Sequence, residues 1–146
     1  MRRFEKVSKY RYEDFELPKR ATKDSGGYDL ASIIDEEILP GEIKLIPTGL
    51  RVKMPKNEVL LVFPRSSLAF KKGLMMSNGV GVIDADYYNA ENEGHIGIPF
   101  YNFSKEKAVI KKGERLAQGI FTNYFKTVDD DNDSTVRLGG FGSSGL

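Results

Sequence analysis

Gly81-Val82-Ile83-Asp84-Ala85-Asp86-Tyr87 is the stretch that decides the fold class, together with the later run His95-Ile96-Gly97-Ile98-Pro99-Phe100-Tyr101-Asn102. Two apolar, strand-like runs flank a polar connection that contains Gly and Asn, and this pattern predicts a β-hairpin. On a regular strand Asp84 and Asp86 would share one face of the sheet. Such a pair is too polar to be buried without a purpose, so we expect chemistry here, with solvated turn carboxylates as the ordinary alternative.

The composition indicates one domain that works without cysteine chemistry. The 146 residues include 22 Lys and Arg against 21 Asp and Glu, a net charge of +1 that is too small to attract a polyanion, so no direct nucleic-acid binding is expected. The sequence has no Cys, and His95 is its only His. These counts exclude thiolate metal sites, a cysteine nucleophile and a Ser-His-Asp triad. Carboxylates, hydroxyls and arginines are left for catalysis.

No segment of the sequence reads as a membrane span or a targeting signal. The N-terminus is charged, and the apolar runs are much shorter than a membrane-spanning helix requires. We therefore expect a soluble, cytoplasmic protein with no membrane partner.

Turn signals punctuate the chain on both sides of the central stretch. Pro40-Gly41 and Pro47-Thr48-Gly49 separate short apolar runs at the spacing of an all-β sandwich or barrel. Residues 1–20 suggest an edge strand with an irregular lead-in. Residues 59–63 read as a buried strand, and residues 64–73 as one short helix that has hydroxyls at its start and Gly at its end.

The end of the chain reads as an acidic linker followed by a tail rich in Gly and Ser. The acidic run 129–133 lacks the Gly and Glu of a calcium loop, because Ser134 and Gly140 stand at those positions. By composition the tail is a disordered linker. It could instead be a clamp whose backbone N–H groups and hydroxyls close over phosphates. We therefore predict an all-β sandwich or barrel domain over 1–128 and a flexible linker and tail over 129–146.

Five short motifs, taken together and in order, resemble those of the trimeric dUTPases. They are Gly27-Tyr28-Asp29-Leu30, Pro64-Arg65-Ser66-Ser67-Leu68-Ala69, residues 78–87, Arg115-Leu116-Ala117-Gln118 and Gly139-Gly140-Phe141-Gly142-Ser143-Ser144-Gly145. The resemblance implies a distorted jelly-roll β-barrel and a homotrimer whose active sites are each built from three chains. It implies hydrolysis of dUTP to dUMP and pyrophosphate, which limits uracil in DNA and supplies dUMP for dTMP synthesis.

The resemblance also implies roles for the residues near the base and the sugar. Asp84 would be the general base for the water that attacks the α-phosphorus, with Asp86 structural. Tyr87 would stack under the deoxyribose and exclude a 2′-hydroxyl, provided that the strand bends after Asp86; simple packing is the alternative for this tyrosine. Asn78 and the backbone of Gly97 would read the uracil. Ile83 is expected among the substrate-binding residues as well.

A second set of residues would hold the triphosphate. Arg65, Ser66 and Ser67 lie at the start of the short helix, and Gln118 would join them, with Asp29 and Arg115 as supporting structure. Mg²⁺ would be bound by phosphate oxygens and water rather than by a protein cage. From the tail, Phe141 would cover the uracil and Ser143 and Ser144 would reach the γ-phosphate. Gly142 and Arg137 complete the expected substrate contacts.

Two departures from the usual pattern stand out. Arg137 lies one place later than the family's phosphate-binding arginine, because Val136 occupies that position. Residues 88–94 lengthen the connection beside the expected uracil pocket, where they could form an idle loop or a lid that meets the closing tail.

Two rival functions remain open at this stage. A dCTP deaminase of the same fold would need a glutamate on the returning strand, where Pro99-Phe100-Tyr101-Asn102 stand. The other rival is a regulatory binding protein that is switched by a nucleotide.

Overall fold

The computed structural model describes residues 1–130 and 135–139, and these residues form a mainly β structure. The strands are β1 (Arg3–Lys6), β2 (Tyr28–Ala31), β3 (Glu36–Ile38), β4 (Ile43–Pro47), β5 (Leu50–Lys53), β6 (Glu58–Pro64), β7 (Leu74–Met76), β8 (Gly81–Asp84), β9 (Gly97–Asn102), β10 (Ala108–Ile110) and β11 (Arg115–Asn123). The described part contains one α-helix, α1 (Ser66–Lys72), and the 3-10 helices η1 (Ser8–Tyr10) and η2 (Ala85–Asn89). The prediction of an all-β fold with one short helix is confirmed.

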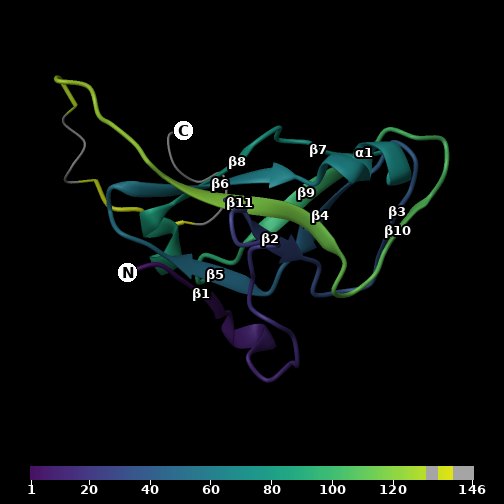
Figure 1. The fold of residues 1–146 in the computed structure, drawn as a ribbon, viewed down its shortest axis with the longest axis horizontal. Helices are drawn as coiled ribbons and strands as arrows, with labels where there is room; N and C mark the ends of the chain where they lie inside the picture. Colours follow the sequence, from purple (N-terminus) through teal and green to yellow (C-terminus); the bar gives the residue numbers. More distant parts are fainter. Residues whose placement is uncertain (131–134, 140–146) are drawn as a thin grey trace.

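Within the described residues, four small sheets surround a common core (Figure 1). The largest has the order β2-β11-β6-β8, and a second has the order β4-β9-β7. The pairs β1-β5 and β10-β3 complete the structure, and all of these pairings are antiparallel. Antiparallel strands can bury one face and leave the other to solvent, which explains the alternating burial along β9.

The predicted β-hairpin over residues 81–102 is wrong. β8 pairs with β6, whereas β9 pairs with β4 and β7, so the two strands belong to different sheets. The connection between them begins with η2 and carries the chain from one sheet to the other. Apolar alternation marked both strands correctly, but it contains no information about which strand each one pairs with.

The core is filled by side chains from every sheet. Leu30, Ile46, Leu60 and Phe100 have no exposed surface and belong to one contiguous cluster of buried residues. β8 contributes Ile83 to this cluster and turns the neighbouring Val82 and Asp84 outward. Burial of the apolar face of β8 therefore fixes the direction in which Asp84 points.

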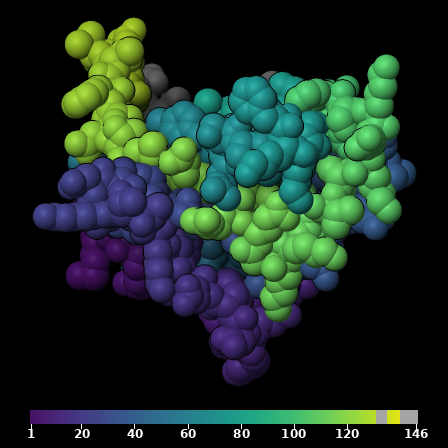
Figure 2. All heavy atoms as spheres, turned by 45° about the vertical axis from the view of Figure 1, so that its right-hand side comes forward, coloured from purple at the N-terminus to yellow at the C-terminus, as the bar shows by residue number. Residues whose placement is uncertain are grey.

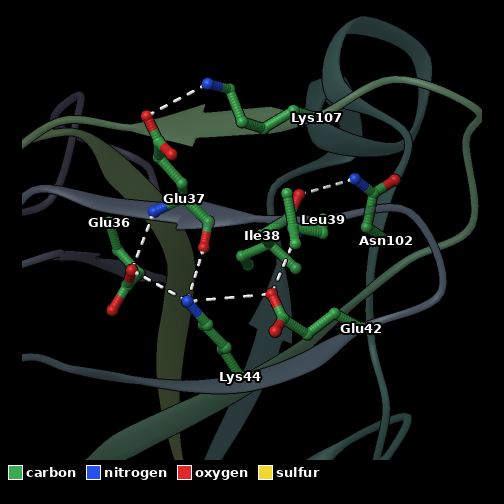
Figure 3. A network of polar contacts seen from close by, with 8 residues as sticks. All are labelled: Glu36, Glu37, Ile38, Leu39, Glu42, Lys44, Asn102 and Lys107. Atoms are coloured by element: carbon green, nitrogen blue, oxygen red, sulfur yellow. Dashed lines mark hydrogen bonds and ion pairs between the residues drawn. The ribbon is translucent and has the colours of Figure 1, made fainter.

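A buried asparagine at the end of β9 is hydrogen-bonded to the end of β3 (Figure 3). The Nδ2 group of Asn102 donates to the carbonyl oxygens of Ile38 and Glu106, each at 2.8 Å. Its Oδ1 atom accepts from the N–H of Ser104 at 2.9 Å. Nearby, Lys44 donates to Glu36 and to the carbonyl of Glu37, which joins β4 to β3. Both the NH₂ group and the carbonyl oxygen of the Asn102 side chain have hydrogen-bond partners, so burying this side chain costs little free energy.

Helix α1 and the segment after β11 lie at the surface. Gly73 ends α1 in the left-handed conformation with φ of 63°, as predicted for this glycine. The expected hydroxyl at the helix start does not cap it, because Arg65 occupies the N-cap position and makes no capping bond. Past β11 the chain stands away from the body as the yellow-green arm of Figure 2, with Phe125 fully in solvent. Among the residues described, no helix has the length and apolar character to cross a membrane.

Candidate active site

Asp84 lies at the last position of β8, where the strand gives way to η2. Its backbone is opposite Val59 of β6, and its side chain is 51% exposed. Asp86 follows on η2 with a side chain that is 57% exposed. The predicted bend therefore comes directly after Asp84, two residues earlier than expected. Both carboxylates open to solvent rather than into the core, so each can meet a ligand.

Arg137 joins the two carboxylates. Its Nη2 atom lies 2.6 Å from Oδ2 of Asp84, and its Nε atom lies 2.8 Å from Oδ1 of Asp86. The carbon centre of the guanidinium also lies 5.9 Å from the ring centroid of Tyr87. Asp84 and Tyr87 thus contact the same cation, which places the carboxylate and the ring close together. In this structure Arg137 contacts the expected general base, rather than the phosphate-binding residues.

Tyr87 is buried and held through its hydroxyl group. The phenol donates to the carbonyl oxygen of His95 at 2.6 Å and accepts from Nδ2 of Asn92 at 2.9 Å. The ring is only 4% exposed and belongs to the main core cluster. Arg137 lies over the ring, so contact between the ring and a sugar requires this arginine to move.

The expected phosphate-binding residues lie at the far end of the same sheet. Gln118 on β11 is opposite Phe63 and Asp29, and Arg65 follows the last residue of β6. The β6 partner of Asp84 is Val59, five residues before Pro64, which corresponds to roughly 16 Å along a strand. One chain therefore does not bring Asp84 and Arg65 together.

The phosphate-side groups are available to a ligand. Within the described residues, the guanidinium of Arg65 and the hydroxyls of Ser66 and Ser67 make no hydrogen bond or ion pair. Arg115, in contrast, lies 3.3 Å from Asp29, which fits the supporting role expected for this pair. The side chain of Gln118 packs against Gly27, where an added Cβ would lie 2.5 Å from its Oε1 atom. A side chain at position 27 would therefore make the amide of Gln118 shift.

The remaining predicted residues fall into three groups. Asn78 is exposed in the turn before β8, and Gly97 begins β9. The side chain of Ile83 is buried in the core, so only its backbone could contact a substrate. The tail residues Phe141, Gly142, Ser143 and Ser144 lie outside the described residues.

A cavity of about 610 Å³ lies away from Asp84. It is lined by residues of the N-terminal lead-in, such as Phe15 and Arg20, and by Asp29 and Arg115. Its position beside Asp29 puts it on the phosphate side of the large sheet rather than beside the carboxylate pair.

Residues 88–94 contact the N-terminal part of the chain. The ring of Tyr88 lies under the guanidinium of Arg51 at 3.6 Å, and its hydroxyl donates to Glu5 at 2.7 Å. Glu93 accepts from the N–H and the hydroxyl of Ser8. These bonds lower the pKa of Glu93, with the backbone N–H of Ser8 as the largest cause. The expectation of a lid is thus not supported, because the segment is fixed against β1, η1 and β5.

His95 lies beside Tyr87, but its contacts were not predicted from the sequence. Its Nε2 atom accepts the backbone N–H of Gly49 at 2.9 Å, and its ring packs against Tyr10. Burial lowers the pKa of His95, with a further decrease from Lys9. The neutral imidazole is the form that can accept this hydrogen bond. A lone histidine gives no such signal in sequence, because its partners come from distant segments.

A family model, a curated relative and a solved structure that match this chain all come from the same family. The family model described as dUTPase matches residues 13–145. A deoxyuridine 5′-triphosphate nucleotidohydrolase of Lactococcus lactis is 48% identical over 147 residues, covering 99% of this chain and 98% of that protein. The crystal structure of a dUTPase from Streptococcus mutans has a TM-score of 0.81 and 44% identity, covering 85% of this chain and 97% of the other.

A more distant structure shares the fold. It is a mutant dUTPase of the Staphylococcus aureus phage phi11, in which a structural Mg(II) ion is coordinated. It has a TM-score of 0.71 and 23% identity, covering 90% of this chain and 99% of that one.

Proposed function

The chain belongs to the dUTPase family and hydrolyses dUTP to dUMP and pyrophosphate, and we propose that Asp84 is its general base. The observation that carries this proposal is the shared contact of Asp84 and Tyr87 with Arg137, which puts an exposed carboxylate beside a sugar-sized aromatic face. In the proposed step, a water oxygen bonds to the α-phosphorus and its proton passes to the carboxylate of Asp84. The bond to the bridging oxygen breaks, and pyrophosphate leaves with the electron pair.

Tyr87 is the proposed platform for the deoxyribose. A rigid ring that is held at its hydroxyl leaves a fixed amount of space beside the sugar, so a 2′-hydroxyl can be excluded by contact. Arg137 covers this ring in the free protein. When dUTP binds, the proposed movement of Arg137 to the phosphates exposes both the ring and Asp84.

The proposed active unit is a homotrimer. This proposal is supported by the separation of Asp84 from Arg65 along β6, because a site that needs both groups has to take them from different chains. In such a site Arg65, Ser66, Ser67 and Gln118 of one chain face the phosphates of a nucleotide that lies on Asp84 of another.

Mg²⁺ is the proposed cofactor, carried by the triphosphate. In this proposal the ligands of the ion are phosphate oxygens and water rather than a cage of protein side chains. When bound, the ion supplies neutralisation of the charge on the departing pyrophosphate.

The proposed division of the chain is a barrel over 1–128 and a linker with a closing tail over 129–146. In this scheme Asn78 and Gly97 contact the uracil, Phe141 covers it, and Gly142, Ser143 and Ser144 contact the phosphates. A cytoplasmic location is proposed as well, where a free nucleotide is the substrate. A dCTP deaminase is disfavoured, because β9 offers no glutamate between Gly97 and Asn102.

The test is pyrophosphate release from dUTP, dCTP, dTTP and UTP with Mg²⁺, by the wild type and by Asp84→Asn. Wild type is expected to prefer dUTP, and the variant to bind dUTP while turning it over about 10²–10⁴-fold more slowly. Asp86→Asn is the matched control, since it removes the neighbouring charge and is expected to retain much more activity. Wild-type turnover by Asp84→Asn would refute the assignment of the base.

A further inference from the structure

The segment 88–94 folds back onto the backbone of Tyr87. Gly94 has φ of 70°, and a Cβ at this position would lie 2.5 Å from the carbonyl oxygen of Tyr87. Glu93 also has positive φ, at 62°, which is uncommon for a side-chain-bearing residue. Its bonds to Ser8 hold Glu93 in place. The segment is therefore a compact turn closed against Tyr87 rather than an extended loop.

This turn also supplies a hydrogen-bond donor to the hydroxyl of Tyr87. The side chain of Asn92 donates to that hydroxyl at 2.9 Å and accepts from the N–H of Gly94 at 3.1 Å. The second bond orients the amide so that its NH₂ group faces the phenol. The hydroxyl of Tyr87 in turn donates to the carbonyl of His95. The phenol is thus held on two sides, once by the turn and once by the residue that follows it.

The outer side of the turn is fixed to other parts of the fold. Glu93 is bonded to Ser8 of η1, and the ring of Tyr88 is held between Arg51 and Glu5. A turn anchored in this way cannot drift away from Tyr87 without breaking several contacts. Asn92 therefore has a rigid base from which to hold the tyrosine.

We propose that Asn92 is a positioning residue that sets the discrimination between dUTP and UTP by holding the ring of Tyr87. This inference rests on the proposed role of Tyr87 as the sugar platform. Without the amide donor, the phenol keeps a single bond to the carbonyl of His95 and can tilt about it. A tilted ring leaves room for a 2′-hydroxyl, so kcat/KM for UTP rises relative to kcat/KM for dUTP.

The experiment measures kcat/KM for dUTP and for UTP in wild type, Asn92→Ala and Asn89→Ala. Asn89 is the matched control, because it is an exposed asparagine in the same segment whose side chain makes no hydrogen bond among the described residues. Asn92→Ala is expected to lower the ratio of kcat/KM for dUTP to kcat/KM for UTP by about three- to tenfold, which is the effect of losing one neutral hydrogen bond. Asn89→Ala is expected to keep the wild-type ratio. Thermal melting of each variant verifies that it is folded.

A double-mutant cycle isolates the contact. Tyr87→Phe removes the hydroxyl and should lower the ratio by itself, and adding Asn92→Ala to it should then have little further effect. A wild-type ratio in Asn92→Ala, an equal loss for both nucleotides, or additive effects in the cycle would each overturn the proposal. A wrong general-base assignment would be detected by a different result, namely wild-type turnover by Asp84→Asn.

Discussion

Arg137 contacts both carboxylates of the candidate site and the ring of Tyr87. Its guanidinium pairs with Asp84 and Asp86, and its side chain is only 11% exposed, although the side chains of both aspartates are about half exposed. A triphosphate is a stronger partner for a guanidinium than two solvated carboxylates, because it carries more charge and can accept bidentate bonds. Substrate binding should therefore release Asp84 from this ion pair.

Removing the cation should lower activity. For Arg137→Ala we expect kcat/KM for dUTP to fall by about 10- to 100-fold, the effect of losing a charge-assisted hydrogen bond to phosphate. Steady-state kinetics measure the change. A matched variant, Val136→Arg with Arg137→Gly, keeps the charge but moves it one residue, and it should be neutral or harmful. A rise in activity in Arg137→Ala would instead show that the arginine restrains the base.

His95 makes folding stability depend on pH. Burial lowers its pKa in the folded protein, whereas in the unfolded chain the pKa is about 6.5. The unfolded chain then takes up a proton at a pH where the folded one does not, so stability is complete above about pH 6.5 and decreases as the pH falls toward the lower folded pKa.

Protonation also removes the acceptor for Gly49, which connects the loss to a specific contact. Melting temperatures of wild type and His95→Gln between about pH 8 and 5 test this, because a glutamine oxygen can still accept the N–H and does not titrate. Wild type should lose more stability over that window. Parallel curves for the two proteins would exclude His95 as the cause.

Among the secondary-structure elements, the connection from β8 to β9 was the hardest to predict. Turn dipeptides and apolar alternation located the strands, the short helix and Gly73 at its end. They could not show that β8 and β9 enter different sheets, since a strand pattern does not specify its partner. The contacts of Asn92 and His95 with Tyr87 were missed for the same reason, although the unusual length of 88–94 pointed to this region.

Shortening this connection should weaken the fold. Replacing Asn89 through Gly94 with a single Gly removes the bonds to Ser8 and to Tyr87, and it removes Ala90, which is 6% exposed in the core. We expect unfolding in urea to show a loss on the order of 1–3 kcal/mol, together with poorer dUTP selectivity. Unchanged stability would mean that the segment is an idle surface loop, as insertions at exposed tips often are.

At the scale of the whole molecule, the proposed general base and the proposed phosphate-binding residues lie far apart within one chain. The large sheet places Asp84 near one end of β6 and Arg65 after the other end, with Gln118 on the adjacent strand β11 and Asp29 on β2 beyond it. The sequence motifs predicted both groups of residues. Their separation within one chain became visible only with the strand register, and a ring of identical chains offers one way to bring them together.

Mixing two inactive variants tests this arrangement. Asp84→Asn and Arg65→Ala should each be nearly inactive alone, because each alters every site of its own trimer. In trimers assembled from equal amounts of both chains, about a quarter of the sites should receive an intact Asp84 from one chain and an intact Arg65 from another.

The control mixes Asp84→Asn with Tyr87→Ala. Asp84 and Tyr87 both contact Arg137 on one chain, so this mixture should restore no activity. Pyrophosphate release from the purified mixed trimers gives the result, and no recovery in the first mixture would place Asp84 and Arg65 of a single chain in the same site.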